Sequence, residues 1–296
     1  MLILRYLALF ILPITLAVAD SSYPSLWESK DPDLQARLEA SVHKNGLLPY
    51  VVKELLSLVI VDITDVHHPR VAELGGDRMI YAASLPKIAI LLGAFVQIEN
   101  KQLELNEELL DDMTDMIRYS SNSAATRVLD RVGRENLLAI LQSSRFQLYD
   151  TEHGGGLWVG KDYAKKGAYR REPIKNLSHS ATAMQVARFY YLLETNRLVG
   201  EELTNTMKEI LSKPGISHKF VRGLQSVPNV EIYRKSGSWR EFHADSALIE
   251  SNGHKFIIIG LAKHPQGGQW LVDIAEPLHD LIMDSETPET DCKYPQ

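Results

Sequence analysis

The chain has 296 residues, with 38 acidic and 32 basic side chains and a formal net charge of -6. This mildly acidic balance argues against a broad nucleic-acid-binding surface. Cys292 is the only cysteine, so the chain cannot form an internal disulfide. A lone cysteine also argues against a cysteine nucleophile and a cysteine-based zinc site. Beyond the first residues, no stretch is long and apolar enough to span a membrane.

Residues 1–19 are predicted to be a secretory signal peptide. Arg5 precedes an apolar stretch over residues 6–18, and residues 17–19 form an A-x-A cleavage site. The alternative is an uncleaved membrane anchor, but the stretch is short, contains Pro13 and lacks a basic stop signal after it. We therefore expect a secreted, periplasmic mature chain without stable membrane insertion.

The mature chain is expected to begin with a helix and a strand hairpin. Apolar residues recur at helical spacing over residues 31–45, where Asp31 is well placed to cap the helix. Residues 55–64 are rich in β-branched side chains, and residues 70–84 follow a turn. Both segments are predicted to contain strands.

Helical patterns dominate the middle of the chain, and strands return near its end. The predicted helices cover residues 85–100, 106–117, 122–131, 134–144, 181–195 and 200–212. The predicted later strands are 230–239, 242–251 and 254–264, followed by a closing helix over 268–284. An irregular stretch at 146–179 interrupts the helices, and such long loops tend to be functional.

Strands at both ends with helices between them predict an α+β fold, in which an antiparallel sheet is built from the N- and C-terminal segments. Residues 20–84 and 225–285 would form this α/β part with its flanking helices. Residues 85–224 would form an inserted all-helical subdomain, and residues 286–296 a flexible tail. Ligand clefts favour such interfaces, and Ser84 lies where the chain crosses from one part to the other.

Ser84 and Lys87 form an S-x-x-K sequence, which alone is a weak signal because Ser41 and Lys44 form another in the first helix. Ser84 is distinguished by its place at the start of an apolar helix, where the helix dipole would favour a developing negative charge. The apolar surroundings would lower the pKa of Lys87 towards that of a useful base. An ordinary helix cap followed by an ordinary lysine remains the alternative.

Two further polar segments could contribute to the same cleft. Ser120 could relay a proton and Asn122 could orient a substrate carbonyl, although both could merely cap the next helix. Lys235, Ser236 and Gly237 lie on a predicted strand and offer a positive charge, a hydroxyl and a close backbone approach for a ligand. Each segment on its own would have an ordinary structural explanation.

In this order, the S-x-x-K, S-x-N and K-[ST]-G segments resemble the serine β-lactamase and penicillin-binding protein superfamily. The segment YSSNSAATRVLDRVG at 119–133 is similar to the S-D-N-T-A-A segment and following helix of class A β-lactamases. The resemblance extends over about residues 31–285. It implies a β-lactamase-like fold and an acyl-serine intermediate that needs no metal or organic cofactor.

The resemblance also implies the roles of individual residues. Ser84 would be the acylated nucleophile, with Lys87 and Ser120 as its proton partners. The backbone N–H groups of Ser84 and Ser238 would form the oxyanion hole.

The remaining matched residues would bind the substrate. Asn122 would hold its amide side chain, and Lys235 and Ser236 its carboxylate. Gly237 would allow the backbone of this strand to approach the ligand closely.

Class A enzymes also need a glutamate that activates the hydrolytic water. Glu172-Pro173 with Asn176 resembles the E-P-x-x-N of that family and would make Glu172 the deacylation base. The chain is longer than in the family between Ser120 and Glu172 and shorter between Ser84 and Ser120, which indicates rebuilt active-site walls. A surface glutamate beside a turn proline is the alternative.

The implied function is a serine hydrolase that acts on amide or ester carbonyls. β-Lactam hydrolysis by a class A-like β-lactamase is the favoured reaction. The alternatives are a D-Ala-D-Ala peptidase or esterase, and a penicillin-binding sensor domain without turnover. Ser121 stands where class A enzymes have aspartate, which is compatible with the S-x-N of penicillin-binding proteins. The expected partner is a small molecule, either a β-lactam or a peptidoglycan-like peptide.

Overall fold

The computed structural model describes residues 23–163 and 167–284. The expected signal peptide at 1–19, the expected flexible tail at 286–296 and Cys292 lie outside these residues. Within the described part, no helix combines the length and the apolar character needed to cross a membrane.

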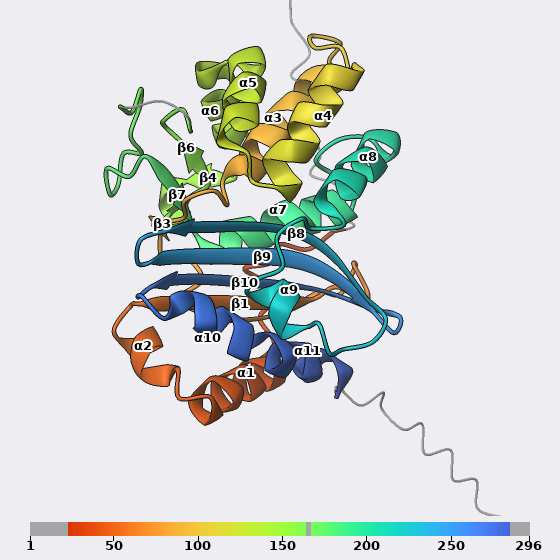
Figure 1. The fold of residues 1–296 in the computed structure, drawn as a ribbon. Coiled ribbons are helices and arrows are strands. Elements are labelled where there is room, and N and C mark those ends of the chain that lie inside the picture. The colour runs from red at the N-terminus through yellow and green to blue at the C-terminus, as the bar shows by residue number, and fades with distance from the viewer. Residues whose placement is uncertain (1–22, 164–166, 285–296) are drawn as a thin grey trace, which may run out of the picture.

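A five-stranded antiparallel sheet forms the centre of the molecule (Figure 1). Its strand order is β2 (Arg70–Leu74), β1 (Leu56–Asp62), β10 (His254–Lys263), β9 (Phe242–Ser251) and β8 (Val230–Trp239). The pairing of β1 with β10 places Leu56 opposite Ala262 and so joins the two ends of the chain. The predicted α+β fold, with an antiparallel sheet built from both ends, is confirmed.

Alternate residues of the strands face two separate apolar cores. In β1, Val59 and Val61 contribute to one core, and Leu58 and Ile60 to the other. On one face lie α1 (Pro32–Lys44), α10 (Gly267–Asp273) and α11 (Ala275–Met283), and on the other lies α7 (Ala183–Glu194). The sheet is therefore covered on both sides.

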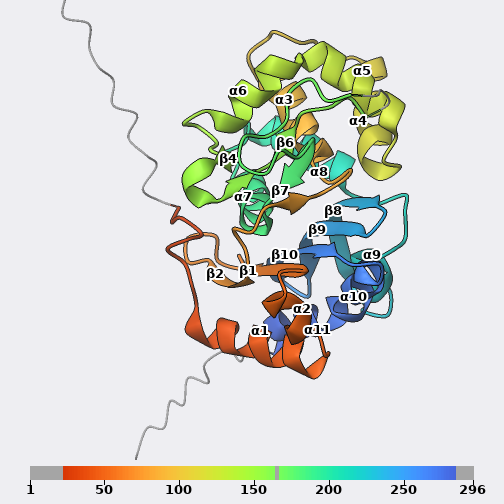
Figure 2. The same ribbon diagram turned by 90° about the vertical axis from the view of Figure 1, so that its left-hand side faces the viewer.

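The remaining long helices lie beyond α7, on the side of the sheet opposite α1 and α11 (Figures 1 and 2). They are α3 (Lys87–Glu99), α4 (Glu107–Arg118), α5 (Asn122–Val132), α6 (Arg134–Gln142) and α8 (Glu201–Leu211). Every residue of α3 from Lys87 to Gln97 is buried, as expected for a helix that is apolar all round. This places the amine of Lys87 in the interior of the protein.

Short elements escaped prediction, and one predicted helix is divided. The closing helix is two helices, α10 and α11, which meet at Ile274. The strand predicted within residues 70–84 is likewise divided, into β2 and β3 (Ile80–Tyr81). The unpredicted elements are α2 (Leu48–Val52), α9 (Phe220–Gly223), β4 (Tyr149–Asp150), β5 (Gly155–Gly156), β6 (Trp158–Val159), β7 (His179–Ala181) and a 3-10 turn at Thr151–His153. Such pieces are too short to show a hydrophobic period.

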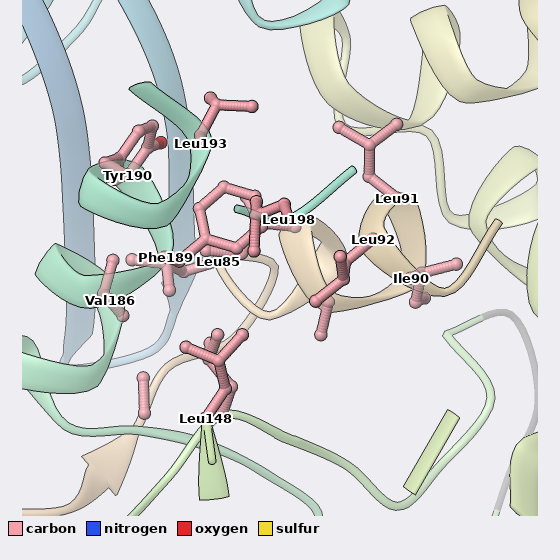
Figure 3. Close-up of a cluster of buried hydrophobic side chains, with 14 of the residues drawn as sticks. Leu85, Ile90, Leu91, Leu92, Leu148, Val186, Phe189, Tyr190, Leu193 and Leu198 are labelled. Atoms are coloured by element: carbon pink, nitrogen blue, oxygen red, sulfur yellow. The ribbon is translucent and has the colours of Figure 1, made fainter. Parts of the chain in front are cut away.

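An apolar cluster joins the helical part to the sheet next to Ser84. Figure 3 shows Leu85 close to Phe189 and Val186 of α7. Tyr190, also on α7, is fully buried and its hydroxyl lies 3.1 Å from Ser246 Oγ on β9. The residue after Ser84 is thus part of the core that fixes α7 on the sheet.

Phe189→Ala is expected to lower the free energy of unfolding by about 3–5 kcal/mol, because it leaves a cavity in this cluster. Urea denaturation measures the loss. Asp111→Ala, on an exposed position of α4, serves as the control and should change the value by no more than about 0.5 kcal/mol. If both variants lost the same free energy of unfolding, the packing of Phe189 in this apolar cluster would be contradicted.

Candidate active site

Ser84 lies in a tight turn that leads into α3. Leu85 N donates to Ala82 O at 3.0 Å, and Lys87 N donates to Ser84 O at 3.2 Å. The first helical residue is Lys87, so the helix begins three residues later than Ser84. Ala83, just before the serine, has a φ of 50°, which is uncommon for a residue other than glycine. The turn therefore presents Ser84 from a strained backbone.

Strand β8 passes directly beside this turn at Gly237. A Cβ atom added there would lie 2.8 Å from Ser84 N and closer still to Ala82 O. We expect this glycine to admit a ligand, and the turn that carries Ser84 also approaches it closely. Gly237 therefore sets the position of Ser84 against Ser238, and both of these residues line the same cavity.

The Lys87 amine is buried beside residues of the second polar segment. Its Nζ donates to Ser120 O at 2.6 Å and to Asn122 Oδ1 at 2.8 Å, and lies 3.4 Å from Ser120 Oγ. It also sits 4.6 Å from the centre of the Tyr163 ring. Burial lowers the pKa of Lys87 to about 7. The amine can therefore be neutral near neutral pH and accept a proton.

Ser121 performs the capping that the sequence allowed for this segment. Its side chain accepts from Ala124 N at 3.2 Å at the start of α5. Ser120, with a φ of 58°, and Asn122 are thereby left to face Lys87. Ser121 therefore caps the helix, whereas Ser120 and Asn122 are the residues of this segment that contact Lys87.

Lys235, in the third polar segment, contacts the hydroxyl group of Ser120. Its side chain is 1% exposed, and Nζ donates to Ser120 Oγ at 3.0 Å and to Ser236 O at 2.7 Å. Burial, reinforced by the nearby charge of Lys87, lowers the pKa of Lys235 well below its usual value. The Ser120 hydroxyl thus lies between two lysine amines, which is the geometry of a proton relay.

Two basic side chains that the sequence analysis missed contact the K-S-G segment. His218 Nε2 lies 3.0 Å from Ser236 Oγ. Lys219 Nζ donates to Gly237 O at 2.6 Å and to Ser238 Oγ at 2.8 Å. Burial lowers the pKa of His218 to about 4 and that of Lys219 to about 8. Neither residue lies in a motif or a periodic segment, so the sequence offered no signal for them.

A buried ion pair fixes the segment that carries these two residues. Arg234 Nε and Nη2 each lie 2.8 Å from an oxygen of Asp245, and the side chains are 3% and 0% exposed. Arg234 also donates to Ile216 O and His218 O, while Asp245 accepts from Phe220 N. The pair therefore holds residues 216–220 against β8 and β9.

The Glu172 carboxylate accepts hydrogen bonds from its own loop and from Tyr149. Its Oε1 accepts from Lys175 N at 2.5 Å and Leu177 N at 3.1 Å, and its Oε2 from Ile174 N at 2.8 Å and the Tyr149 hydroxyl at 3.2 Å. The residue is 1% exposed and does not line the cavity at Ser84. The turn that begins at Glu172 directs its own N–H groups at the carboxylate, so spacing alone could not reveal this orientation.

A cavity of about 510 Å³ opens at Ser84. Ser84, Asn122 and Ser238 line it together with aromatic residues of the loop before β7 and of the β8–β9 hairpin. Tyr163 stacks on His179 with ring centres 4.3 Å apart, and its hydroxyl donates to Ala83 O at 3.2 Å. The loop expected to be functional therefore forms one wall of the cleft.

A model described as the beta-lactamase enzyme family matches residues 108–282. The chain belongs to this family. The matched region contains the second and third polar segments but begins after Ser84 and Lys87, whose placement beside them comes from the fold. No curated protein sequence matches the chain.

Solved β-lactamase-like structures share the fold at low sequence identity. PBP-A is 15% identical over 86% of this chain and 97% of its own, with a TM-score of 0.64. A β-lactamase from Sphaerobacter thermophilus DSM 20745 is 17% identical over 77% and 92%, with a TM-score of 0.60. A class A representative from Bacteroides cellulosilyticus DSM 14838 is 11% identical over 84% and 98%, with a TM-score of 0.64. Family and fold together make the protein a serine β-lactamase-like hydrolase.

Gly237→Ala should slow acylation of Ser84 by a fluorescent penicillin by about 100-fold, because the new methyl group would displace the turn that carries Ser84. Gly200→Ala is the matched control, since a Cβ there meets only one side-chain atom at 3.8 Å. A Gly237→Ala protein that is folded by circular dichroism and acylates at the rate of the control would contradict this geometry.

Proposed function

We propose that this member of the beta-lactamase family is a penicillin-binding serine hydrolase that forms a long-lived acyl-enzyme with β-lactams. A D-Ala-D-Ala peptide or a small ester is its turnover substrate. Hydrolysis of β-lactams, which the sequence favoured, becomes the second candidate. Secretion directed by residues 1–19 is part of the proposal.

The position of Glu172 carries this proposal. Both of its carboxylate oxygens accept hydrogen bonds from their own loop or from Tyr149, and the residue is 1% exposed. Among the residues that the structure describes, no aspartate or glutamate lines the cavity at Ser84. Rapid release of a β-lactam acyl group needs a base for the attacking water.

The chemistry of the two substrates explains why one acyl group persists. Opening of a β-lactam ring leaves the amine attached to the acyl group, where it occupies the cleft. The amine or alcohol released from a peptide or ester diffuses away and admits water. A PBP-A variant has been solved as an acyl-enzyme complex with penicillin G, which supports acylation on this fold.

Acylation would proceed through the three polar segments. Ser84 Oγ attacks the carbonyl carbon while neutral Lys87 accepts the hydroxyl proton. The negative charge on the carbonyl oxygen is bound by the N–H groups of Ser84 and Ser238. The bond to the leaving group then breaks, and its nitrogen or oxygen takes a proton through Ser120, which lies between the amines of Lys87 and Lys235.

Substrate orientation would rest on Asn122 and on the K-S-G segment. Asn122 Oδ1 accepts from Lys87, so its amide N–H group is available for a substrate carbonyl. Lys235 and the Ser236 hydroxyl would bind the substrate carboxylate, whose negative charge would favour the protonated form of the Lys235 amine. His218 is a positioning residue, because it contacts the Ser236 hydroxyl.

The acylation rate should rise with pH and reach half of its maximum near pH 7. Lys87, with a pKa of about 7, is protonated below that pH and cannot accept the Ser84 proton, whereas above it the amine is neutral. Stopped-flow acylation with a fluorescent penicillin over a pH series measures this profile. Lys87→Ala should leave a slow residual rate without this rise, and a wild-type rate that falls with pH would contradict the role of Lys87.

Intact mass spectrometry after exposure to penicillin tests the function itself. We expect an adduct of the full penicillin mass that persists for hours and is absent from Ser84→Ala. Release of D-Ala from a D-Ala-D-Ala peptide, or hydrolysis of a small thioester, identifies the turnover substrate. An adduct without any turnover of these substrates would point to a sensor domain.

Glu172→Gln separates the proposal from β-lactamase activity. Because the amide turns a donor towards N–H groups, we expect the variant to lose about 1–3 kcal/mol of stability while its penicillin adduct decays as slowly as in the wild type. Glu135→Gln, on an exposed carboxylate, is the control. If the wild-type adduct decays within minutes and accumulates in Glu172→Gln, the protein is a β-lactamase with Glu172 as its base.

A further inference from the structure

The cleft at Ser84 carries positive charge without a carboxylate to balance it. Lys161 and Arg171 line the cavity, and no acidic residue in the described part of the chain lines it with them. Within that part, neither side chain forms an ion pair. This is unexpected in a protein with 38 acidic and 32 basic residues. Unpaired cations in a concave site attract and orient anionic ligands.

The fold holds these two cations in place. Gly160 packs so closely on Arg170 O that a Cβ at 160 would overlap it, and Trp158 Nε1 donates to the same oxygen at 2.9 Å. Lys161 and Arg171 are the next residues along these two packed segments. Arg171 Nη1 also donates to Asn176 O at 3.0 Å. The charges are therefore presented by an ordered wall.

The neighbouring histidine does not change this charge balance. His179 also lines the cavity and is 3% exposed. Burial, reinforced by the charges of Lys161 and Lys87, lowers the pKa of His179 to about 3, so its ring is neutral at neutral pH. The cationic character of this wall comes from Lys161 and Arg171.

The cavity belongs to the acyl side of the substrate. Ser84 lines it together with Asn122, the residue proposed to bind the acyl amide, whereas Lys235 and Ser236 do not line it. We propose that Lys161 and Arg171 form a second anion subsite, which selects substrates whose acyl group carries a carboxylate. This subsite rests on the proposed function and acts in addition to the carboxylate site at Lys235 and Ser236.

The test uses carbenicillin and benzylpenicillin, which share the ring system and phenyl group and differ by a carboxylate on the acyl side chain. The measured quantity is the ratio of their second-order rate constants for acylation of Ser84. Lys161→Met and Arg171→Met should each lower the ratio of carbenicillin to benzylpenicillin about threefold, and the double variant roughly tenfold. Arg170→Gln is the matched control, because its guanidinium pairs with Glu135 outside the cavity.

Salt provides a second readout of the same subsite. The wild-type ratio should fall between about 0.1 and 1 M NaCl, over which the Debye length shortens from about 10 to about 3 Å. The ratio in the double variant should respond much less. A wild-type ratio that ignores both salt and the two substitutions would overturn the subsite while leaving acylation of Ser84 intact.

Binding without chemistry separates the subsite from the proposed function. Calorimetry on Ser84→Ala should show that carbenicillin loses more affinity than benzylpenicillin when Lys161 and Arg171 are replaced in that background. If the wild type is not acylated but this difference is present, the proposed function fails and the subsite stands. If the difference is absent, the subsite is rejected regardless of acylation.

Discussion

Three lysine amines are buried where α3, β8 and the segment before α9 meet, and this constraint organises the rest of the site. Within the described part of the chain, Lys87, Lys219 and Lys235 form no ion pair with a carboxylate. Their hydrogen bonds run to neutral acceptors such as Ser120 O and Gly237 O. A buried ammonium group with neutral partners loses much of its hydration, so the neutral amine is favoured.

This electrostatic arrangement depends on packing at two places. The apolar helix α3 must be buried all round to carry Lys87 inside, and the cluster at Leu85 and Phe189 fixes it against the sheet. Strand β8 must then approach the turn at Ser84 closely enough for Lys235 to reach Ser120, which requires a residue without a Cβ at Gly237. Stability and reactivity are therefore set by the same contacts.

Sequence patterns predicted the strands and long helices, which have periodic apolar positions, and the polar segments, whose residues are close together in the chain. Strands β8 and β9 agree with their predicted bounds, and the long helices differ by a few residues, because burial imposes a period on their apolar positions. The three polar segments could be found because their residues are close in sequence. The sequence could not predict that the segments meet at Ser120, because Lys235, which donates to the Ser120 hydroxyl, lies 115 positions away in the chain.

What the sequence could not provide was the direction of individual side chains. Glu172, Pro173 and Asn176 have the spacing of a catalytic loop, yet the carboxylate turns into the loop because three N–H groups converge on it. His218 and Lys219 sit in an irregular segment whose path is set by the distant ion pair of Arg234 and Asp245. Hydrogen bonds between residues far apart in the chain produce no periodic pattern in the sequence, so they cannot be predicted from it.

The position of Glu172 also changes what its loop contributes to the site. By closing the turn from 172 to 177, the carboxylate fixes Asn176, whose carbonyl holds Arg171 at the cavity. Under the proposed function, Glu172 would thus stabilise the cavity wall instead of activating water. Anions bound at that wall favour the protonated form of Lys87, which opposes its role as a base. The opposition is weak because exposed charges are screened by salt, whereas the lowered pKa of Lys87 arises from burial.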